Sequence, residues 1–169
     1  MPPKKQPSRK PKSGNTSKSP ESTAEQAKSE DLKAVNKMIG GLMDWYFIKI
    51  NGDQQTEWFD VLLNVDTVDG LEGSKFVLGN IEESIAKARE MLETDYANCH
   101  RYAYAWRGYW QSPDGKKYDG ALIYLESQTL TPGVYGIEIG PDSNGKLVPI
   151  SPLVQLQIGD WSLLHRSKS

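Results

Sequence analysis

Cysteine is scarce in this sequence of 169 residues, and long apolar runs are missing. The single cysteine, Cys99, excludes an intramolecular disulfide framework and fits a reducing compartment. No apolar stretch approaches the roughly 18 residues that a membrane-spanning helix needs. We therefore expect no membrane contact and a cytoplasmic location, or a nuclear one in a eukaryotic cell. With two histidines beside that cysteine, the chain is short of the N and S ligands of a structural zinc site, so we expect no metal and no cofactor.

Acidic side chains are absent from the first twenty residues, and this absence divides the chain by charge. The segment carries six basic side chains: Lys4, Lys5, Arg9, Lys10, Lys12 and Lys18. It also holds five of the ten prolines and almost nothing apolar, so residues 1–28 are predicted to form a disordered basic arm. The rest of the chain carries 14 basic against 22 acidic side chains. The net charge of −2 is therefore the sum of a positive N-terminal segment and a negative remainder.

The common catalytic motifs are also missing. The chain contains no G-x-S-x-G, H-E-x-x-H or G-x-G-x-x-G pattern. Cys99 and His100 are neighbours on a predicted strand, where successive side chains point to opposite faces, so they do not form a nucleophile–base pair with each other. No catalytic residue is assigned, and the sequence favours a binding protein over an enzyme.

Two helices are predicted. The first begins at Ser29, a typical N-cap, and carries apolar residues at helical spacing through Leu42. The second covers residues 81–95 and begins after Asn80, which with Glu83 approximates a capping box. Its apolar residues form one stripe, so we expect this helix to pack on a sheet.

The remaining segments are predicted to be strands joined by turns. Residues 45–50 are aromatic and β-branched, and Asn51-Gly52 after them is typical of a two-residue hairpin leading into a strand at 56–65. Residues 66–74 are predicted to be a loop, followed by a short strand at 75–78. Further strands are predicted at 101–111, 118–127, 134–139, 146–150 and 154–158.

This order of elements predicts an α+β fold. We expect an antiparallel sheet of about five to seven strands with two helices on one face, preceded by the disordered basic arm. Residues 29–169 are predicted to form a single compact domain, because a segment of this length buries enough apolar surface for one core.

Two sets of residues are candidates for interaction. The six basic side chains of the arm are each able to neutralise a phosphate, which predicts salt-sensitive, non-specific binding of nucleic acid or another polyanion. A candidate surface for a protein partner comprises Trp58, Arg107, Tyr109 and Trp110, since aromatic and arginine side chains are enriched at interfaces. On one strand, Tyr102, Tyr104 and Trp106 share a face that we expect to cover the helix at 81–95.

The sequence thus supports three functional hypotheses. The first is a non-catalytic binding module, with an acidic, aromatic-rich domain for a protein partner and a basic arm for a polyanion. The second is a small acidic inhibitor or immunity-type protein that blocks a basic, nucleic-acid-binding target. The third is an enzyme whose motifs are not recognisable.

Overall fold

The computed structural model describes residue 3 and residues 20–52 and 60–158. All six basic side chains of the arm and Trp58 lie outside the described residues. The elements follow one another as α1 (Pro20–Ile50), β1 (Asp60–Thr67), β2 (Gly70–Val77), α2 (Ile81–Thr94), β3 (Arg101–Gln111), β4 (Lys117–Glu126), β5 (Gly133–Pro141), β6 (Leu147–Pro149) and β7 (Val154–Ile158).

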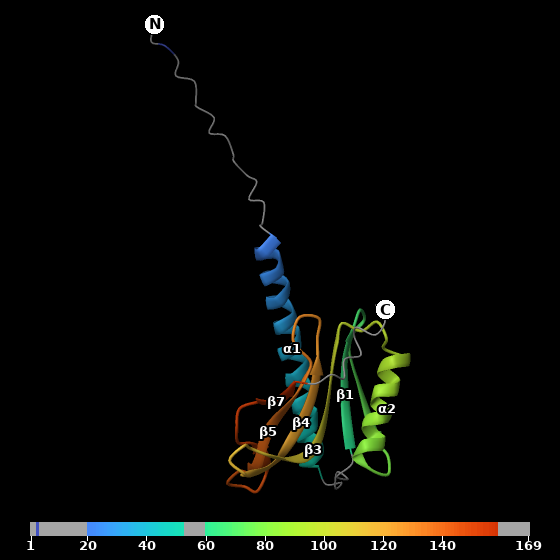
Figure 1. Ribbon diagram of the computed structural model, residues 1–169, viewed down its shortest axis with the longest axis vertical. Helices are drawn as coiled ribbons and strands as arrows, with labels where there is room; N and C mark the ends of the chain where they lie inside the picture. The colour runs from blue at the N-terminus through green and yellow to red at the C-terminus, as the bar shows by residue number, and fades with distance from the viewer. Residues whose placement is uncertain (1–2, 4–19, 53–59, 159–169) are drawn as a thin grey trace.

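The seven strands form one antiparallel sheet. The order is β2-β1-β3-β4-β5-β6, and β7 pairs with another part of β5 (Figure 1). This confirms the α+β class, the antiparallel pairing and the number of strands. The long central pair β3–β4 runs in register from Tyr102 opposite Glu126 to Gln111 opposite Lys117.

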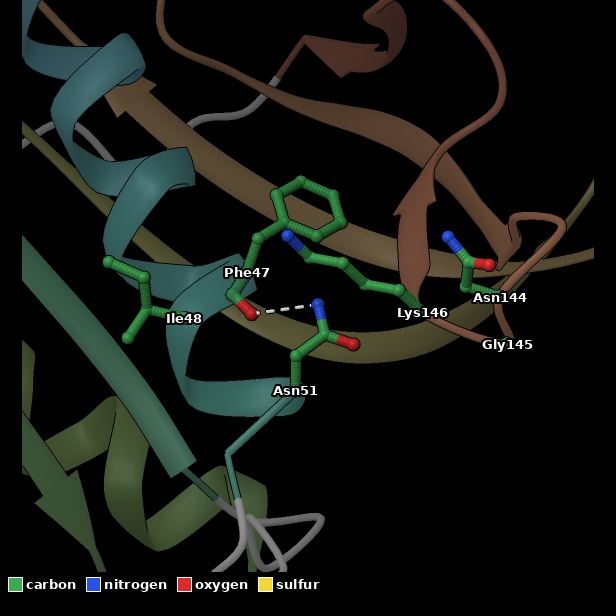
Figure 2. A pocket seen from close by; sticks show the side chains of 6 residues that line it. All are labelled: Phe47, Ile48, Asn51, Asn144, Gly145 and Lys146. Carbon is green, nitrogen blue, oxygen red and sulfur yellow. Dashed lines mark hydrogen bonds between the residues drawn. The ribbon is translucent and has the colours of Figure 1, made fainter.

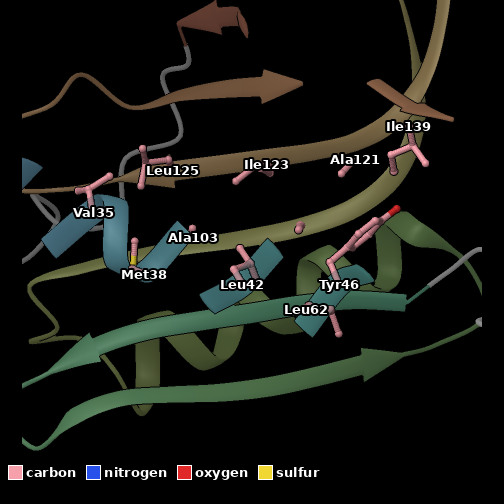
Figure 3. Close-up of a cluster of buried hydrophobic side chains, with 11 residues drawn as sticks. Val35, Met38, Leu42, Tyr46, Leu62, Ala103, Ala121, Ile123, Leu125 and Ile139 are labelled. Atoms are coloured by element: carbon pink, nitrogen blue, oxygen red, sulfur yellow. The ribbon is translucent and has the colours of Figure 1, made fainter. Parts of the chain in front are cut away.

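The two helices lie on opposite faces of the sheet, so the prediction that both share one face is wrong. Met38 and Leu42 of α1 are buried in one cluster with Ala103, Ala105 and Ala121 of the sheet, together with longer side chains of β1, β4 and β5 (Figure 3). Ala88 and Leu92 of α2 are buried in another cluster with tyrosines of β3 and β4. The tyrosines therefore cover α2, as expected. The alanines point the other way, and their small side chains leave room for α1.

Helix α1 is much longer than predicted. It begins at Pro20, so residues 20–28 are helical rather than part of a disordered arm, and it continues through residues 45–50, which were predicted to be a strand. Accordingly, Asn51-Gly52 is the end of a helix and not a hairpin turn. Four buried side chains at spacings of three and four explain the extension: Val35, Met38, Leu42 and Tyr46. Before this stripe, residues 23–30 are exposed on all sides and extend beyond the sheet (Figure 1).

The second helix agrees with its prediction. Asn80 has extended backbone angles, and its side-chain oxygen accepts the backbone N–H of Glu83 at 2.8 Å. Two acidic residues in the first turn, Glu82 and Glu83, are placed favourably for the helix dipole.

One strand prediction needs correction. Residues 66–74 are not a loop, because β1 and β2 form a hairpin in which Thr67 lies opposite Gly70. The strands from β3 to β7 agree with prediction within one or two residues, whereas residues 56–59 of the strand predicted at 56–65 lie outside the described residues. The turns after β3 and β5 place Gly115 and Gly145 at φ 87° and 79°, a conformation that favours glycine.

A buried ionic network attaches α1 to the sheet. Asp31, 3% exposed, accepts hydrogen bonds from Arg101 Nε at 2.9 Å, from Ser127 Oγ at 2.7 Å and from Thr129 Oγ1 at 2.5 Å. Arg101 also pairs with Asp66 of β1. Burial alone would raise the pKa of Asp31, but the hydrogen bonds from Thr129, Ser127 and Arg101 outweigh it and hold the pKa below its ordinary value. Among the described residues, no helix is long and apolar enough to span a membrane.

Candidate functional site

An open groove lies on the α2 face of the sheet, beyond the part that α2 covers. We call it the aromatic groove. Its volume is about 1210 Å³. Its walls come from β3, β4, β5, β7 and the turn between β3 and β4: Trp106, Trp110, Gln111, Ser112, Pro113, Gly115, Lys116, Tyr118, Leu122, Val134, Glu138, Ser151, Val154, Gln155 and Leu156.

Strand geometry explains why these side chains meet. Trp106 and Trp110 are even-numbered positions of β3, on the same face as the tyrosines that pack on α2. Their partners on β4 are Leu122 and Tyr118. The rings of Trp110 and Tyr118 stack with centroids 5.7 Å apart and 16° between their planes. The groove is thus the uncovered continuation of the face on which α2 packs.

Three glycines, which lack side chains, leave space on the face of the sheet around Trp110. Gly108 lies opposite Gly120 on β3 and β4, and Gly136 lies on β5. A Cβ at Gly120 would lie 2.9 Å from Trp110 Cη2, and one at Gly136 would lie 3.1 Å from Trp110 Cζ2. The indole therefore rests directly on glycine backbone, in space that any other residue would occupy. This packing fixes the position of the ring, which is an advantage for binding because little freedom remains to be lost.

The structure separates the residues that were predicted to form one interaction surface. Trp110 lines the aromatic groove. Arg107 and Tyr109 are odd-numbered positions of β3 and lie on the opposite face, the α1 face. Trp58 is outside the described residues, as are the six basic side chains of the arm.

On the α1 face, Arg107 pairs with Asp119 of β4. The distance from Arg107 Nη2 to Asp119 Oδ2 is 3.0 Å, and this pairing raises the pKa of the guanidinium. Tyr109 is 65% exposed two residues further along β3. A guanidinium with a carboxylate already beside it is a poor site for a further anion, so we do not place a binding site there.

A second, smaller hollow lies between the end of α1 and the turn that joins β5 to β6. Figure 2 shows its lining: Phe47, Ile48, Asn51, Asn144, Gly145 and Lys146. The amide of Asn51 donates to Phe47 O at 3.0 Å and to Leu147 O at 2.8 Å, and its oxygen accepts the Leu147 N–H. Because that amide holds the helix to β6, this hollow is best explained as part of the fold.

The residues weighed for nucleophilic chemistry do not form a reactive pair. Burial, and the nearby charge of Glu126, raise the pKa of the Cys99 thiol to about 11. The thiol is therefore protonated near neutral pH, whereas the thiolate is the nucleophile. His100 Nδ1 lies 3.4 Å from the Gln128 amide. Within the part of the chain that the structure describes, no group of three or more His, Cys, Asp or Glu side chains is placed to hold a metal ion.

The sequence interpretation named Trp110 as a candidate but did not predict the groove around it. The sequence does contain a signal for the groove. It is the alternation of Trp106, Gly108 and Trp110, in which two large rings flank a gap on one face of the strand. Which strands lie beside β3, and hence that Gly136 and Leu156 border the same ring, depends on the sheet order and is not visible in local sequence.

Comparison of the chain with known protein families, with curated protein sequences and with solved structures finds no match in any of the three.

Proposed function

We propose that this chain is a non-catalytic binding module. Its domain contacts a protein partner through the aromatic groove, and its basic arm contacts nucleic acid or another polyanion. The observation that supports the first part is the fixed, partly uncovered stack of Trp110 and Tyr118 at the groove wall. Aromatic side chains held in a pocket supply most of the binding energy at many protein interfaces. The single half-buried cysteine is consistent with action in the cytoplasm.

Groove binding is tested by blocking the groove without disturbing the core. Val154 lines the groove and is 48% exposed, so Val154→Arg narrows the groove while leaving buried residues in place. The matched control is Val68→Arg in the turn between β1 and β2, where Val68 is 83% exposed. Partners captured by the full-length chain are identified, purified and titrated against each variant. We expect V154R to weaken binding at least tenfold and V68R to leave it unchanged. Equal affinities for the two variants would exclude the groove.

Arm binding is tested separately. A variant in which all six basic residues at positions 4 to 18 are replaced by glutamine is compared with the native chain on duplex DNA. If all six contact phosphates, the affinity of the native chain falls about a thousandfold between 50 and 200 mM salt. The variant shows no such salt dependence. A native chain that binds with no salt dependence would contradict the proposal.

The acidic inhibitor is the second candidate, and the charge of residues 21–169 favours it. Their 22 acidic against 14 basic side chains suit a basic target and repel a phosphate backbone. Titration against a basic nuclease at two salt concentrations distinguishes the candidates. An inhibitor retains tight binding when the six arm residues are neutralised, whereas a module that acts through its arm does not.

A further inference from the structure

The aromatic groove contains a carboxylate without an assigned role. Glu138 of β5 lines it and is partly buried. Its backbone is held on both sides: its N–H donates to Ser151 Oγ at 2.8 Å, and its carbonyl accepts the Ile150 N–H at 2.8 Å. In the described part of the chain, its carboxylate has no hydrogen-bond or ion-pair partner. A carboxylate without a partner on a fixed backbone is suited to pair with a charge from outside.

Glu138 lies next to the half-buried indole of Trp110. It faces Gly120 across the β4–β5 pair and follows Gly136 by two residues, so all three share one face of the sheet. Gly120 and Gly136 are the two glycines on which the ring of Trp110 rests. A ligand lying on that ring is therefore within reach of the carboxylate.

The other charged residue that lines the groove, Lys116, already contacts an aromatic ring. Of the described residues that line the groove, only Glu138 and Lys116 are charged. The Lys116 ammonium lies 5.1 Å from the centroid of the Tyr118 ring, where cation and ring attract each other. Lys116 thus shows that the Tyr118 ring of this aromatic stack already accepts a cation.

We propose that the aromatic groove binds an arginine side chain from a protein partner, with the guanidinium stacked on Trp110 and paired with Glu138. A guanidinium suits both contacts, because its flat, weakly hydrated surface stacks on an indole and its N–H groups form paired bonds with a carboxylate. The net negative charge of residues 21–169 attracts a basic partner from a distance. This inference rests on the proposed function and names the chemistry that the groove recognises.

The test uses defined peptides and the full-length chain. The probe is a capped octapeptide of glycine and threonine with one arginine, compared with the same peptide carrying citrulline, a neutral group of the same shape. Binding is followed through the indole N–H resonance of Trp110, assigned with Trp110→Phe. We expect the arginine peptide to move this resonance and to bind at least tenfold tighter than the citrulline peptide.

A carboxylate variant assigns the preference to Glu138. Glu138→Gln keeps the size of the side chain and removes its charge, so we expect the tenfold preference for arginine to fall below threefold while citrulline binding is unchanged. Glu82→Gln, on an exposed turn of α2, is the matched control and leaves the preference intact. Thermal unfolding of both variants confirms that they fold.

Several outcomes would overturn the inference. Equal binding of the arginine and citrulline peptides, or an unchanged preference in E138Q, excludes recognition by Glu138. Movement of the Trp110 resonance by a valine peptide but not by the arginine peptide excludes a cationic ligand and leaves the proposed groove binding standing. Arginine binding that appears only after the six basic residues at positions 4 to 18 are replaced by glutamine assigns the groove to the chain's own N-terminal segment instead of a partner.

Discussion

Asn51 and Leu147 exchange two hydrogen bonds across 96 positions of sequence. The amide nitrogen of Asn51 donates to Leu147 O at 2.8 Å, and the Leu147 N–H donates to the amide oxygen at 2.9 Å. The side chain thereby makes the pair of bonds that a neighbouring strand would make. One residue both ends α1 and continues the bonding of β6.

Replacement of Asn51 by alanine should therefore lower stability. The two bonds to Leu147 and the bond to Phe47 O are lost, and we expect the free energy of unfolding in urea to fall by about 1–3 kcal/mol. Asn144→Ala, on the exposed turn between β5 and β6, is the control and should change it by less than about 0.5 kcal/mol. Equal stabilities would show that Asn51 does not anchor β6.

Asp31→Asn tests the buried network through its pH dependence. We expect a loss of about 2–4 kcal/mol at pH 7, because Arg101 loses a charged partner within the protein. The pKa of Asp31 is lower in the folded chain than its ordinary 3.8, so its contribution is complete above pH 5 and is lost as the pH falls through the folded pKa. The difference between native and variant chains should therefore shrink below pH 4. Asp69→Asn, in an exposed turn, serves as the control, and a difference independent of pH would contradict the assignment.

Two buried tyrosines should respond oppositely to loss of their hydroxyl groups. The hydroxyl of Tyr46 is buried and has no hydrogen-bond partner among the described residues, whereas that of Tyr102 donates to Glu126 Oε2 at 2.6 Å. We expect Tyr46→Phe to leave stability unchanged or raise it by up to about 1 kcal/mol, since an unsatisfied buried group is removed. Tyr102→Phe should cost about 1–3 kcal/mol. Similar losses for both, measured by urea unfolding, would reveal a partner for Tyr46.

The thiol of Cys99 should react slowly. With its pKa raised from 9.0 to about 11, the thiolate fraction at pH 8 falls on the order of a hundredfold. We expect iodoacetamide to alkylate the folded chain at least that much more slowly than the urea-unfolded chain, with a rate that increases up to pH 10. Rapid alkylation at pH 8 would instead indicate an activated cysteine and would favour the hypothesis that the chain is an enzyme.

Local sequence predicted most elements, and the error at residues 45–50 is the most instructive of those it made. Their aromatic and β-branched side chains favour a strand, but Tyr46 continues the buried stripe of Met38 and Leu42 at helical spacing. Burial against Ala103 and Ala105 outweighs the strand preference. The helical spacing of Tyr46 was available in the sequence, and it was a better guide than residue type.

The placement of the helices and the position of the groove were harder to predict from the sequence. The alternation of tyrosine and alanine on β3 was recognised, but not that each face would receive its own helix. The groove depends on the neighbours of β3, since Trp110 rests on glycines of β4 and β5. Such contacts between distant segments follow from sheet order, which spacing within one strand does not specify.

The length of α1 separates the start of this helix from the aromatic groove. Its 31 residues span about 46 Å, and Tyr46 near its end packs in the same cluster as Ile139, the neighbour of Glu138 on β5. The first turn of α1 thus lies tens of ångströms from Glu138, several times the Debye length of about 8 Å at physiological salt. If the arm binds a phosphate surface as proposed, salt therefore screens the charge of that surface from the groove. Under the proposed function, the length of α1 would set the separation between a polyanion bound by the arm and a protein partner bound in the groove.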